Sequence, residues 1–406
     1  MIMKKVKLLT SYFPYGIGEP FLEQEVLYWA ERSQDIQLEI MPFKKTSCQR
    51  KIPKKVLLNE LYAFDVNYLY IFKLMTFGFF WNELTYLFKS GKFSIKNLLR
   101  LIKYGILIIQ AYIRLEKAGS QPDYYYSYWS NFSSYAALLM KKKHELKVVT
   151  RIHRHDLYEY LYEKNYMPFK RQFIHNYDQI YVLSEEGVNY LKATFCVDEK
   201  KIIAMPLGVS VFETEKTINT SNVDCIRIVS VSNIIQIKRI DKIIDAISVL
   251  AKKIDAHIVW HHYGDGELMD KTLKYASQKL EKLKNVQYVF KGAVRNDELQ
   301  NLLAYEHYDL IINSSESEGV PVSLMEAMAK KIVPIAPDVG GIKYLINNFN
   351  GYLLTENCHL NEIVNAIISY IKLDEESRFS LQNNCFQVIC TKYNSEVNYN
   401  KFISSF

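Results

Sequence analysis

Two carboxylates lie eight positions apart in the chain, where Glu318 and Glu326 flank the loop 319–323. An ionised carboxylate only accepts hydrogen bonds, so it binds vicinal hydroxyl groups well. Glycine allows the backbone to approach a ligand closely, and the N–H groups of a helix start attract anions. One carboxylate for each sugar ring, with backbone amides for the phosphates between them, fits a nucleotide sugar. The spacing also fits an ordinary acidic helix start with Glu326 on a solvated face.

The flanking residues indicate the elements that hold these carboxylates. An apolar run at Leu310–Ile312 precedes them, a helix-like run covers Leu324–Lys330, and a second apolar run covers Ile332–Ala336. Pro321 is placed where proline is common, in a first helical turn. The stretch therefore predicts a strand, a loop, a helix and a further strand.

This stretch resembles the Glu-x7-Glu segment of the retaining glycosyltransferases of family 4, which have the GT-B fold. The resemblance continues in the family's order and spacing through Glu326–Ala329, Pro334–Ala336, Asp338–Gly341 and Asn350–Leu353. It implies an α/β fold with two Rossmann-like domains, each a doubly wound parallel sheet, facing across a cleft. Alternating strands and helices in both halves of the chain favour the same architecture.

The resemblance also implies roles for the residues of this segment. Glu318 is expected at the donor sugar and Glu326 at the ribose hydroxyls of a nucleotide-sugar donor. The loop between them is also expected to bind the donor through its backbone amides. Pro321 is excluded from these contacts because it has no N–H. The expected contacts in this loop are Gly319, Val320, Val322 and Ser323.

A second cluster follows the β-branched run Ile226–Val231 and precedes an amphipathic helix. Family members place an arginine and a lysine here, five positions apart, on the donor diphosphate. Lys238 matches the lysine, whereas Asn233 stands in place of the arginine and brings no charge. Arg239 is the candidate that supplies the positive charge missing at Asn233. A cation at a helix start opposes the helix dipole, which favours a ligand, although a solvated helix start also fits.

Two sites in the first half of the chain also match the family. Gly16 and Gly18 follow the predicted strand Val6–Thr10, in a loop that faces the cleft in GT-B enzymes. The loop lacks the third glycine of a dinucleotide fingerprint, and an ordinary turn fits equally well. Further on, His153 and Asp156 match the family's His-Gly-x-Asp, which implies that His153 contacts the donor sugar and Asp156 shapes the site.

The pair His153 and His155 could also bind a metal, but no third ligand is evident nearby, so we expect no metal and no cofactor. Arg154 replaces the glycine of the family's motif, and Tyr344 follows Lys343 where the family commonly has Pro-Glu. These departures keep open an inactive glycosyltransferase-like partner or glycan-binding subunit. A GT-B sugar-nucleotide epimerase is a third alternative.

Composition sets the broad class. The 406 residues suffice for two domains, and 49% hydrophobic with 23% charged residues indicates a globular chain. The net charge of +7 suits nucleotide phosphates, acidic lipid surfaces or nucleic acid. No recognised nucleic-acid module is visible, so we expect no nucleic-acid partner. Six cysteines without a Cys-x-x-Cys pair fit a reducing cytosol, and we expect a cytoplasmic protein.

We predict four segments. Residues 1–212 form an acceptor-binding domain, the polar stretch 213–224 a linker, and residues 225–385 the nucleotide-sugar domain, while 386–406 form a helix that crosses back to the first domain. Residues 68–117 mix large apolar side chains with eight lysines and arginines and two glutamates. Such helices lie peripherally on anionic membranes, or they pack on the sheet with their lysines in solvent. No run is long and apolar enough for a transmembrane helix.

These observations predict a retaining transfer of a sugar from a nucleotide-diphosphate donor to a hydroxyl of a glycan or a lipid-linked glycan. A UDP-sugar is favoured and a GDP-sugar comes second. Lys238 would stabilise the charge of the departing diphosphate. Family members are thought to retain configuration by same-face attack assisted by the leaving group. The expected setting is the synthesis of bacterial capsule, exopolysaccharide or lipopolysaccharide.

Overall fold

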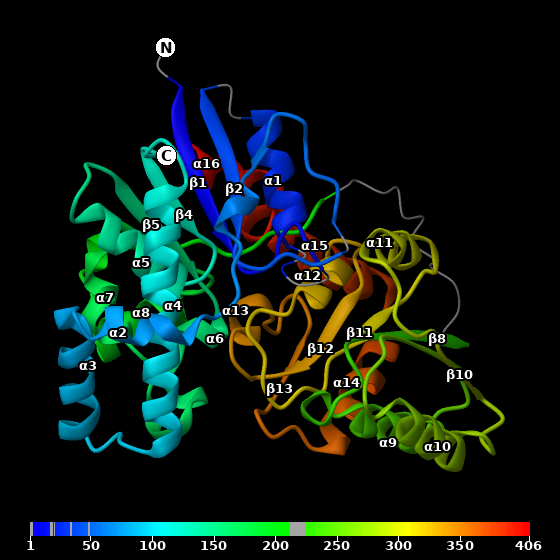
Figure 1. Ribbon diagram of the computed structural model, residues 1–406. Coiled ribbons are helices and arrows are strands. Elements are labelled where there is room, and N and C mark those ends of the chain that lie inside the picture. Colours follow the sequence, from blue (N-terminus) through cyan, green and yellow to red (C-terminus); the bar gives the residue numbers. More distant parts are fainter. Residues whose placement is uncertain (1–2, 17–18, 20, 33–34, 48, 212–223) are drawn as a thin grey trace. The chain divides into compact units, whose positions relative to one another are not determined.

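A computed structural model describes residues 3–16, 19, 21–32, 35–47, 49–211 and 224–406 (Figure 1). The chain divides into two compact units. Unit 1 comprises Met1–Pro206 and Tyr399–Phe406, and unit 2 comprises Leu207–Asn398. Gly18 and the predicted linker, apart from Asp224, lie outside the described residues.

Unit 1 is built on a seven-stranded parallel sheet in the order β3-β2-β1-β4-β5-β6-β7. Its strands are β1 (Lys4–Thr10), β2 (Ile36–Pro42), β3 (Leu57–Leu58), β4 (Tyr124–Ser127), β5 (Lys147–Ile152), β6 (Gln179–Val182) and β7 (Ile202–Ala204). Its α-helices are α1 (Phe21–Arg32), α2 (Ile71–Leu74), α3 (Gly78–Lys89), α4 (Ile95–Lys117), α5 (Phe132–Lys141), α6 (Arg154–Leu157), α7 (Lys170–Phe173) and α8 (Glu185–Phe195). Short 3-10 turns are η1 (Glu60–Tyr62), η2 (Tyr68–Tyr70), η3 (Glu159–Leu161), η4 (Glu163–Asn165), η5 (Ile174–Asn176) and η6 (Glu199–Lys201).

Successive side chains of a strand point to opposite faces, and the strands of unit 1 use both faces. Val6 and Leu8 of β1 pack with α1 and with Phe402, whereas Leu9 packs with helices α4 and α5. Helix α1 lies on one side of β1, and α4 and α5 lie on the other (Figure 1). The strands are therefore buried on both faces, as expected for a doubly wound sheet.

Unit 2 contains a six-stranded parallel sheet in the order β10-β9-β8-β11-β12-β13. Its strands are β8 (Cys225–Val231), β9 (His257–Tyr263), β10 (Val286–Phe290), β11 (Leu310–Ile312), β12 (Val333–Pro337) and β13 (Tyr352–Leu354). Its helices are η7 (Gln236–Lys238), α9 (Ile240–Leu250), α10 (Met269–Leu280), α11 (Asn296–Tyr305), α12 (Val322–Met328), α13 (Ile342–Leu345), α14 (Leu360–Ile371) and α15 (Glu375–Lys392). The last helix, α16 (Ser395–Ile403), begins in unit 2 and ends in unit 1.

The two faces of this sheet are also covered. Helices α9, α10 and α14 bury one face around Trp260 and Ile335, and α11, α12 and α15 bury the other around Ile311 and Ala336. The prediction of two doubly wound parallel sheets is thus confirmed. Across the described residues, no helix is both long and apolar enough to cross a membrane.

Candidate functional site

The order of strands places one candidate site at the carboxyl edge of the sheet in unit 2. The chain leaves β8 in one direction for β9 and returns to pair β11 on the other side of β8. Ligands of open α/β sheets bind outside the carboxyl ends of the strands at such a reversal. The loop after β8 carries Lys238, and the loop after β11 carries Glu318.

The structure brings these two predicted residues into direct contact. The Nζ atom of Lys238 lies 2.5 Å from Oε1 of Glu318, and the two side chains are 20% and 12% exposed. The same oxygen accepts hydrogen bonds from Asn313 Nδ2 at 3.1 Å and from Ser315 Oγ at 2.7 Å. The carboxylate therefore holds the lysine at the carboxyl edge of the sheet.

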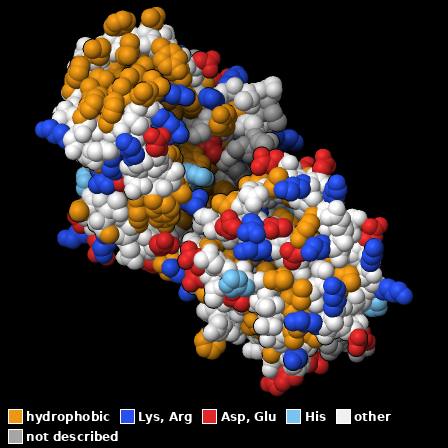
Figure 2. Space-filling model, turned by 90° about the horizontal axis from the view of Figure 1, so that it is seen from below, with side chains coloured by type: hydrophobic (Ala, Val, Ile, Leu, Met, Phe, Trp, Pro, Cys, Tyr) orange, Lys and Arg blue, Asp and Glu red, His pale blue; other side chains and the backbone are white. Residues whose placement is uncertain are grey.

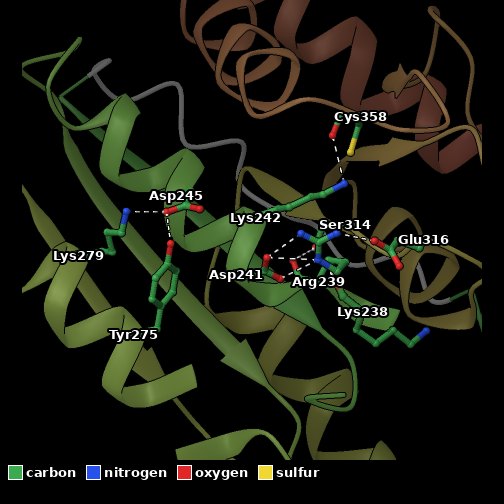
Figure 3. A network of polar contacts seen from close by, with 10 residues as sticks. All are labelled: Lys238, Arg239, Asp241, Lys242, Asp245, Tyr275, Lys279, Ser314, Glu316 and Cys358. Atoms are coloured by element: carbon green, nitrogen blue, oxygen red, sulfur yellow. Dashed lines mark hydrogen bonds and ion pairs between the residues drawn. The ribbon is translucent and has the colours of Figure 1, made fainter. Parts of the chain in front are cut away.

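Arg239 has a different set of partners from Lys238. Its guanidinium donates to both Asp241 oxygens and to Glu316, and hydrogen bonding to Asp241 is the main cause that raises its pKa (Figure 3). Ser314 Oγ donates to the main-chain oxygens of Lys238 and Arg239 at 2.9 and 2.8 Å. The loop after β11 thus fixes the backbone of the loop after β8, while two carboxylates engage Arg239.

Asn233 is exposed in the loop after β8, and a glycine turn supports this loop. Ile234 N donates to Asp265 O at 3.0 Å. A Cβ atom at Gly264 would lie 1.8 Å from Ser232 O, and one at Gly266 would lie 2.4 Å from Ile234 O. Only glycine allows the two backbones to pack so closely, so this turn has a structural role.

A second glycine pair supports the backbone of Glu318. Gly341 N donates to Gly319 O at 2.8 Å, and Gly340 has a φ of +57°. A Cβ atom at Gly340 would lie 1.9 Å from Glu318 O. Val320 and Ser323 are half-buried on the same segment. Pro321 is the N-cap with extended backbone, so α12 begins at Val322, two residues earlier than predicted, and Pro321 precedes the first turn.

Glu326 lies in α12 and is buried, with 6% of its surface exposed. Its Oε1 accepts a hydrogen bond from Asn296 Nδ2 at 2.8 Å, at the start of α11. Burial raises the pKa of Glu326 to about 7, against the opposing effect of Asn296 and Gln300. A solvated helix face, the alternative that the spacing left open, is therefore wrong for Glu326.

In unit 1, the corresponding reversal of strand order lies between β1 and β4. The loop after β1 includes Gly16, which has a φ of +64°. Glu19 in this loop accepts hydrogen bonds from the main-chain N atoms of residues 11, 12 and 13 and, at 2.6 Å, from Trp129 Nε1. The carboxylate of Glu19 thus occupies backbone amides that could otherwise bind a phosphate.

His153 follows β5 and lies against two aromatic rings. Its ring centroid is 4.6 Å from that of Tyr128 and 4.4 Å from that of Trp129. Burial, with a smaller effect of Arg151, lowers the pKa of His153 to about 3, so the imidazole is neutral at pH 7. Both ring nitrogens are buried without a hydrogen-bond partner among the described residues.

Asp156 holds the turn that carries His153. Its two oxygens accept from His153 N at 2.7 Å and from Ser130 N at 2.6 Å, and burial raises its pKa to about 6. Lys170 Nζ donates to Ser130 Oγ and to the main-chain oxygen of Asp156, and burial lowers the pKa of this lysine to about 8. Asp156 therefore holds the backbone of this turn, and its role at a donor site stays a prediction.

Sequence reasoning missed several residues that complete these arrangements. Asn313 and Ser315 directly follow β11, and a polar residue at the end of a buried strand is a signal that could have found them. Asn296 gave no such signal, because its contact with Glu326 joins segments 30 residues apart in sequence. Glu19 and Lys170 gave none either, because their contacts with Trp129 and Ser130 depend on the fold of unit 1. Within the described part of the chain, no three His, Cys, Asp or Glu side chains gather to hold a metal ion.

Comparison with known protein families gives a match in the second half of the chain. The family "Glycosyl transferases group 1" matches residues 211–387. A poly(ribitol-phosphate) alpha-N-acetylglucosaminyltransferase of Staphylococcus aureus is 28% identical over 198 residues, which cover 48% of this chain and 36% of that enzyme. The chain thus matches little more than a third of the length of this relative.

Solved structures match nearly the whole chain. A mutant of S. aureus TarM in complex with fondaparinux, alpha-GlcNAc-glycerol and UDP gives a TM-score of 0.68 at 17% identity over 99% of both chains. HepE of Anabaena in complex with UDP-glucose gives a TM-score of 0.61 at 14% identity over 98% of both chains. The chain has the GT-B fold, and its residues 211–387 are similar to the glycosyl transferases group 1.

Proposed function

We propose that this protein is a retaining glycosyltransferase that moves a sugar from a nucleotide-diphosphate sugar to a hydroxyl of a glycan or a lipid-linked glycan. A UDP-sugar is the favoured donor and a GDP-sugar the second choice. UDP in the TarM complex and UDP-glucose in the HepE complex support this order. The setting we propose is the synthesis of a bacterial capsule, exopolysaccharide or lipopolysaccharide, with no metal or cofactor required.

The contact between Lys238 and Glu318 is the observation that carries the proposal. When the bond between the anomeric carbon and the diphosphate breaks, negative charge develops on the leaving oxygen. Lys238, whose Nζ atom lies 2.5 Å from Oε1 of Glu318, can exchange this carboxylate for the diphosphate and stabilise that charge. Glu318 is then free to accept hydrogen bonds from donor-sugar hydroxyls, beside the backbone of Gly319, Val320 and Val322 and the hydroxyl of Ser323.

Glu326 supplies the second half of the donor site in this proposal. Its ionised carboxylate would accept hydrogen bonds from two ribose hydroxyls, with Asn296 orienting it. Because its pKa is about 7, a bound pair of hydroxyl donors favours the ionised form and compensates the cost of burying the charge. Asn233 and Arg239 lie on the neighbouring loop and would act as polar contacts of the diphosphate region.

For unit 1 we propose that the turn of His153 and Asp156, with the glycine loop at Gly16, binds sugar hydroxyls. Buried polar atoms are nearly always hydrogen-bonded, so the two unpartnered ring nitrogens of His153 favour a ligand. A neutral imidazole can donate at one nitrogen and accept at the other. His153 is therefore a hydrogen-bonding residue at pH 7 and not an acid.

In the chemical step, the acceptor hydroxyl oxygen bonds to the anomeric carbon while the bond from that carbon to the diphosphate oxygen breaks. The proton of the hydroxyl passes to the departing diphosphate, and the sugar keeps its anomeric configuration. A lipid-linked acceptor would place this reaction at a membrane, and peripheral contact with an anionic membrane surface is part of the proposal.

A donor panel tests the proposed reaction. UDP-, GDP- and ADP-sugars, with UDP-GlcNAc and UDP-glucose among them, are incubated with the protein, and the released nucleotide and sugar products are measured. We expect one donor to turn over slowly, at a rate that Lys238→Ala and Glu326→Ala reduce at least about tenfold. Lys252→Ala and Glu281→Ala, two exposed residues of unit 2, are matched controls that keep the rate.

An inactive glycosyltransferase-like partner is the second candidate, because Asn233 is uncharged and Lys238 is paired with Glu318. Donor binding without turnover, with lipid-linked acceptors added, would establish that candidate. Conversion of the donor to an epimer would reject both.

A further inference from the structure

Large apolar side chains are exposed on one part of unit 1 to an unusual extent. Among the described residues, nine of the 21 exposed large hydrophobic side chains fall within residues 68–99. These nine, which we call the apolar face, are 37–75% exposed and comprise Tyr68, Leu69, Phe72, Met75, Trp81, Phe88, Phe93, Ile95 and Leu99. Figure 2 shows apolar side chains gathered on unit 1 in this region.

The spacing of these residues makes them one surface. Residues three or four positions apart lie on the same side of a helix. Phe72 of α2 and its C-cap residue Met75 are three apart, and Ile95 and Leu99 of α4 are four apart. The rings of Phe88 and Phe93 stack with their centroids 4.5 Å apart and connect the end of α3 to α4. Soluble monomers rarely expose large contiguous apolar patches, and such patches mark interaction sites.

The same segment is strongly basic on its outside. Residues 68–117 contain six lysines, two arginines and two glutamates. Glu83 is buried and accepts hydrogen bonds from Tyr166 and Gln172. Glu116 pairs with Lys143 at 3.0 Å. The net charge that this segment presents to solvent is therefore positive.

Three exposed lysines lie beside members of the apolar face. Lys73 follows Phe72, Lys89 follows Phe88, and Lys103 lies one helical turn beyond Leu99. Lysine side chains extend along apolar surfaces while their ammonium groups stay in the polar layer. Two other lysines of this segment have partners within unit 1. Lys92, which precedes α4, pairs with Glu159 at 3.7 Å, and Lys96 of α4 pairs with Glu163 at 3.5 Å.

We propose that the apolar face lies in the interface of an anionic phospholipid membrane, with the lysines at the headgroups. Apolar rings that insert among acyl chains, a rim of lysines and an exposed tryptophan together match the chemistry of such an interface. The indole of Trp81 already donates to Met75 O at 2.8 Å, so the exposed edge of its ring is available to lipid. This assignment deepens the membrane contact in the proposed function, but vesicle binding requires neither donor nor turnover.

Vesicle flotation tests the assignment on the full chain. Vesicles of phosphatidylglycerol and phosphatidylcholine in equal parts are compared with phosphatidylcholine alone. We expect binding to the anionic vesicles and at least about tenfold weaker binding to the neutral ones. The variant Phe72→Ser, Ile95→Ser, Leu99→Ser should lose at least about tenfold in binding. The variant Lys73→Gln, Lys89→Gln, Lys103→Gln should behave in the same way.

The matched control is Tyr305→Ser with Phe349→Ser in unit 2, whose side chains are 76% and 79% exposed, and it should bind like the unaltered protein. On anionic vesicles the tryptophan emission should shift to the blue, and Trp81→Phe should abolish the shift.

Equal binding of the apolar-face variant and the unaltered protein would overturn the assignment. A second result would also overturn the assignment. If sedimentation shows that the unaltered protein dimerises with rising concentration and that only the apolar-face variant does not, a second copy of the chain covers the face. Loss of donor turnover with vesicle binding intact would contradict the proposed transfer alone.

Discussion

At the scale of single residues, burial decides what Glu326 and His153 can do. The pKa of Glu326 is about 7 because burial penalises its charged form, and that of His153 is about 3 for the same reason. The sequence predicted both positions from a family motif but not their protonation. Protonation depends on side chains such as Asn296 and Trp129, which lie far away along the chain.

The raised pKa of Glu326 predicts a pH-dependent affinity for UDP. Below pH 7 the free carboxyl is protonated and can no longer accept hydrogen bonds at both oxygens, so affinity should fall about tenfold between pH 7.5 and 6. Glu326→Gln should have lower affinity at pH 7.5 and a flatter profile. Calorimetric titrations with both proteins separate this effect from titration of the phosphate itself, and parallel profiles would contradict it.

The same pKa has a consequence for stability. The folded state binds the proton of Glu326 more tightly than the unfolded state, whose carboxyl titrates near 4.5. Its ionisation therefore costs stability above about pH 7, and this cost disappears as the pH falls toward 4.5. Relative to Glu326→Gln, the unfolding free energy of unit 2 should rise as the pH is lowered through this window. Urea unfolding at pH 7.5 and 5.5 measures the difference.

At the scale of elements, glycine contacts determine where the site loops lie. The sequence predicted the strand, loop and helix around Glu318 because apolar runs and turn residues alternate there. It could not predict that the turn after β12 packs on this loop, since the packing follows from the pairing of β11 with β12. Likewise, the contact between Lys238 and Glu318 follows from β8 and β11 being neighbours.

Gly340→Ala should displace the loop of Glu318. Its added Cβ atom would lie 1.9 Å from Glu318 O, so the backbone must move, and we expect at least about tenfold weaker UDP binding. Gly119→Ala is the control, because Gly119 also has a positive φ, of +83°, but nothing lies within 4 Å of its Cβ position. It should lose about 1–2 kcal/mol of stability and keep its affinity. Equal affinities of the two variants would reject this role of the loop.

A buried ion pair joins β5 to α1 in unit 1. Arg151 Nη1 lies 2.9 Å from Glu25 Oε2, and the side chains are 1% and 0% exposed. Arg151→Met leaves an uncompensated carboxylate and should cost about 3–5 kcal/mol in the unfolding free energy of unit 1. Glu25→Leu added to that variant should restore much of the loss. Lys141→Met, at the more exposed pair with Asp178, should cost about 1 kcal/mol or less.

At the scale of the whole molecule, the chain connects its two units twice. It leaves unit 1 at Pro206 and re-enters it at Tyr399. The sequence indicated a helical tail, but the structure breaks it at Tyr393 and Asn394 into α15 and α16. The reason is that the last residues pack among the side chains of unit 1, a partnership that periodicity in the tail alone does not reveal.

Phe402 is the centre of this packing. The centroid of its ring lies 6.2 Å from that of Trp29 and 5.0 Å from that of Tyr126. The guanidinium carbon of Arg151 lies 4.5 Å from the same centroid. Phe402→Ala should lower the unfolding free energy of unit 1 by about 3–5 kcal/mol and leave that of unit 2 unchanged. Phe379→Ala, at an exposed ring of α15, is the matched control. Calorimetric unfolding resolves the two transitions, and a shift in the transition of unit 2 alone would contradict the assignment.

The central claim is that unit 2 binds a nucleoside diphosphate through Lys238 and Glu326, and titration calorimetry with UDP at pH 7.5 tests it most directly. The account predicts saturable binding by the unaltered protein, weakened at least about tenfold in Lys238→Ala and in Glu326→Ala. Lys252→Ala and Glu281→Ala should bind as tightly as the unaltered protein. Affinity for UDP that neither site substitution reduces, or binding of neither UDP nor GDP, would contradict the account.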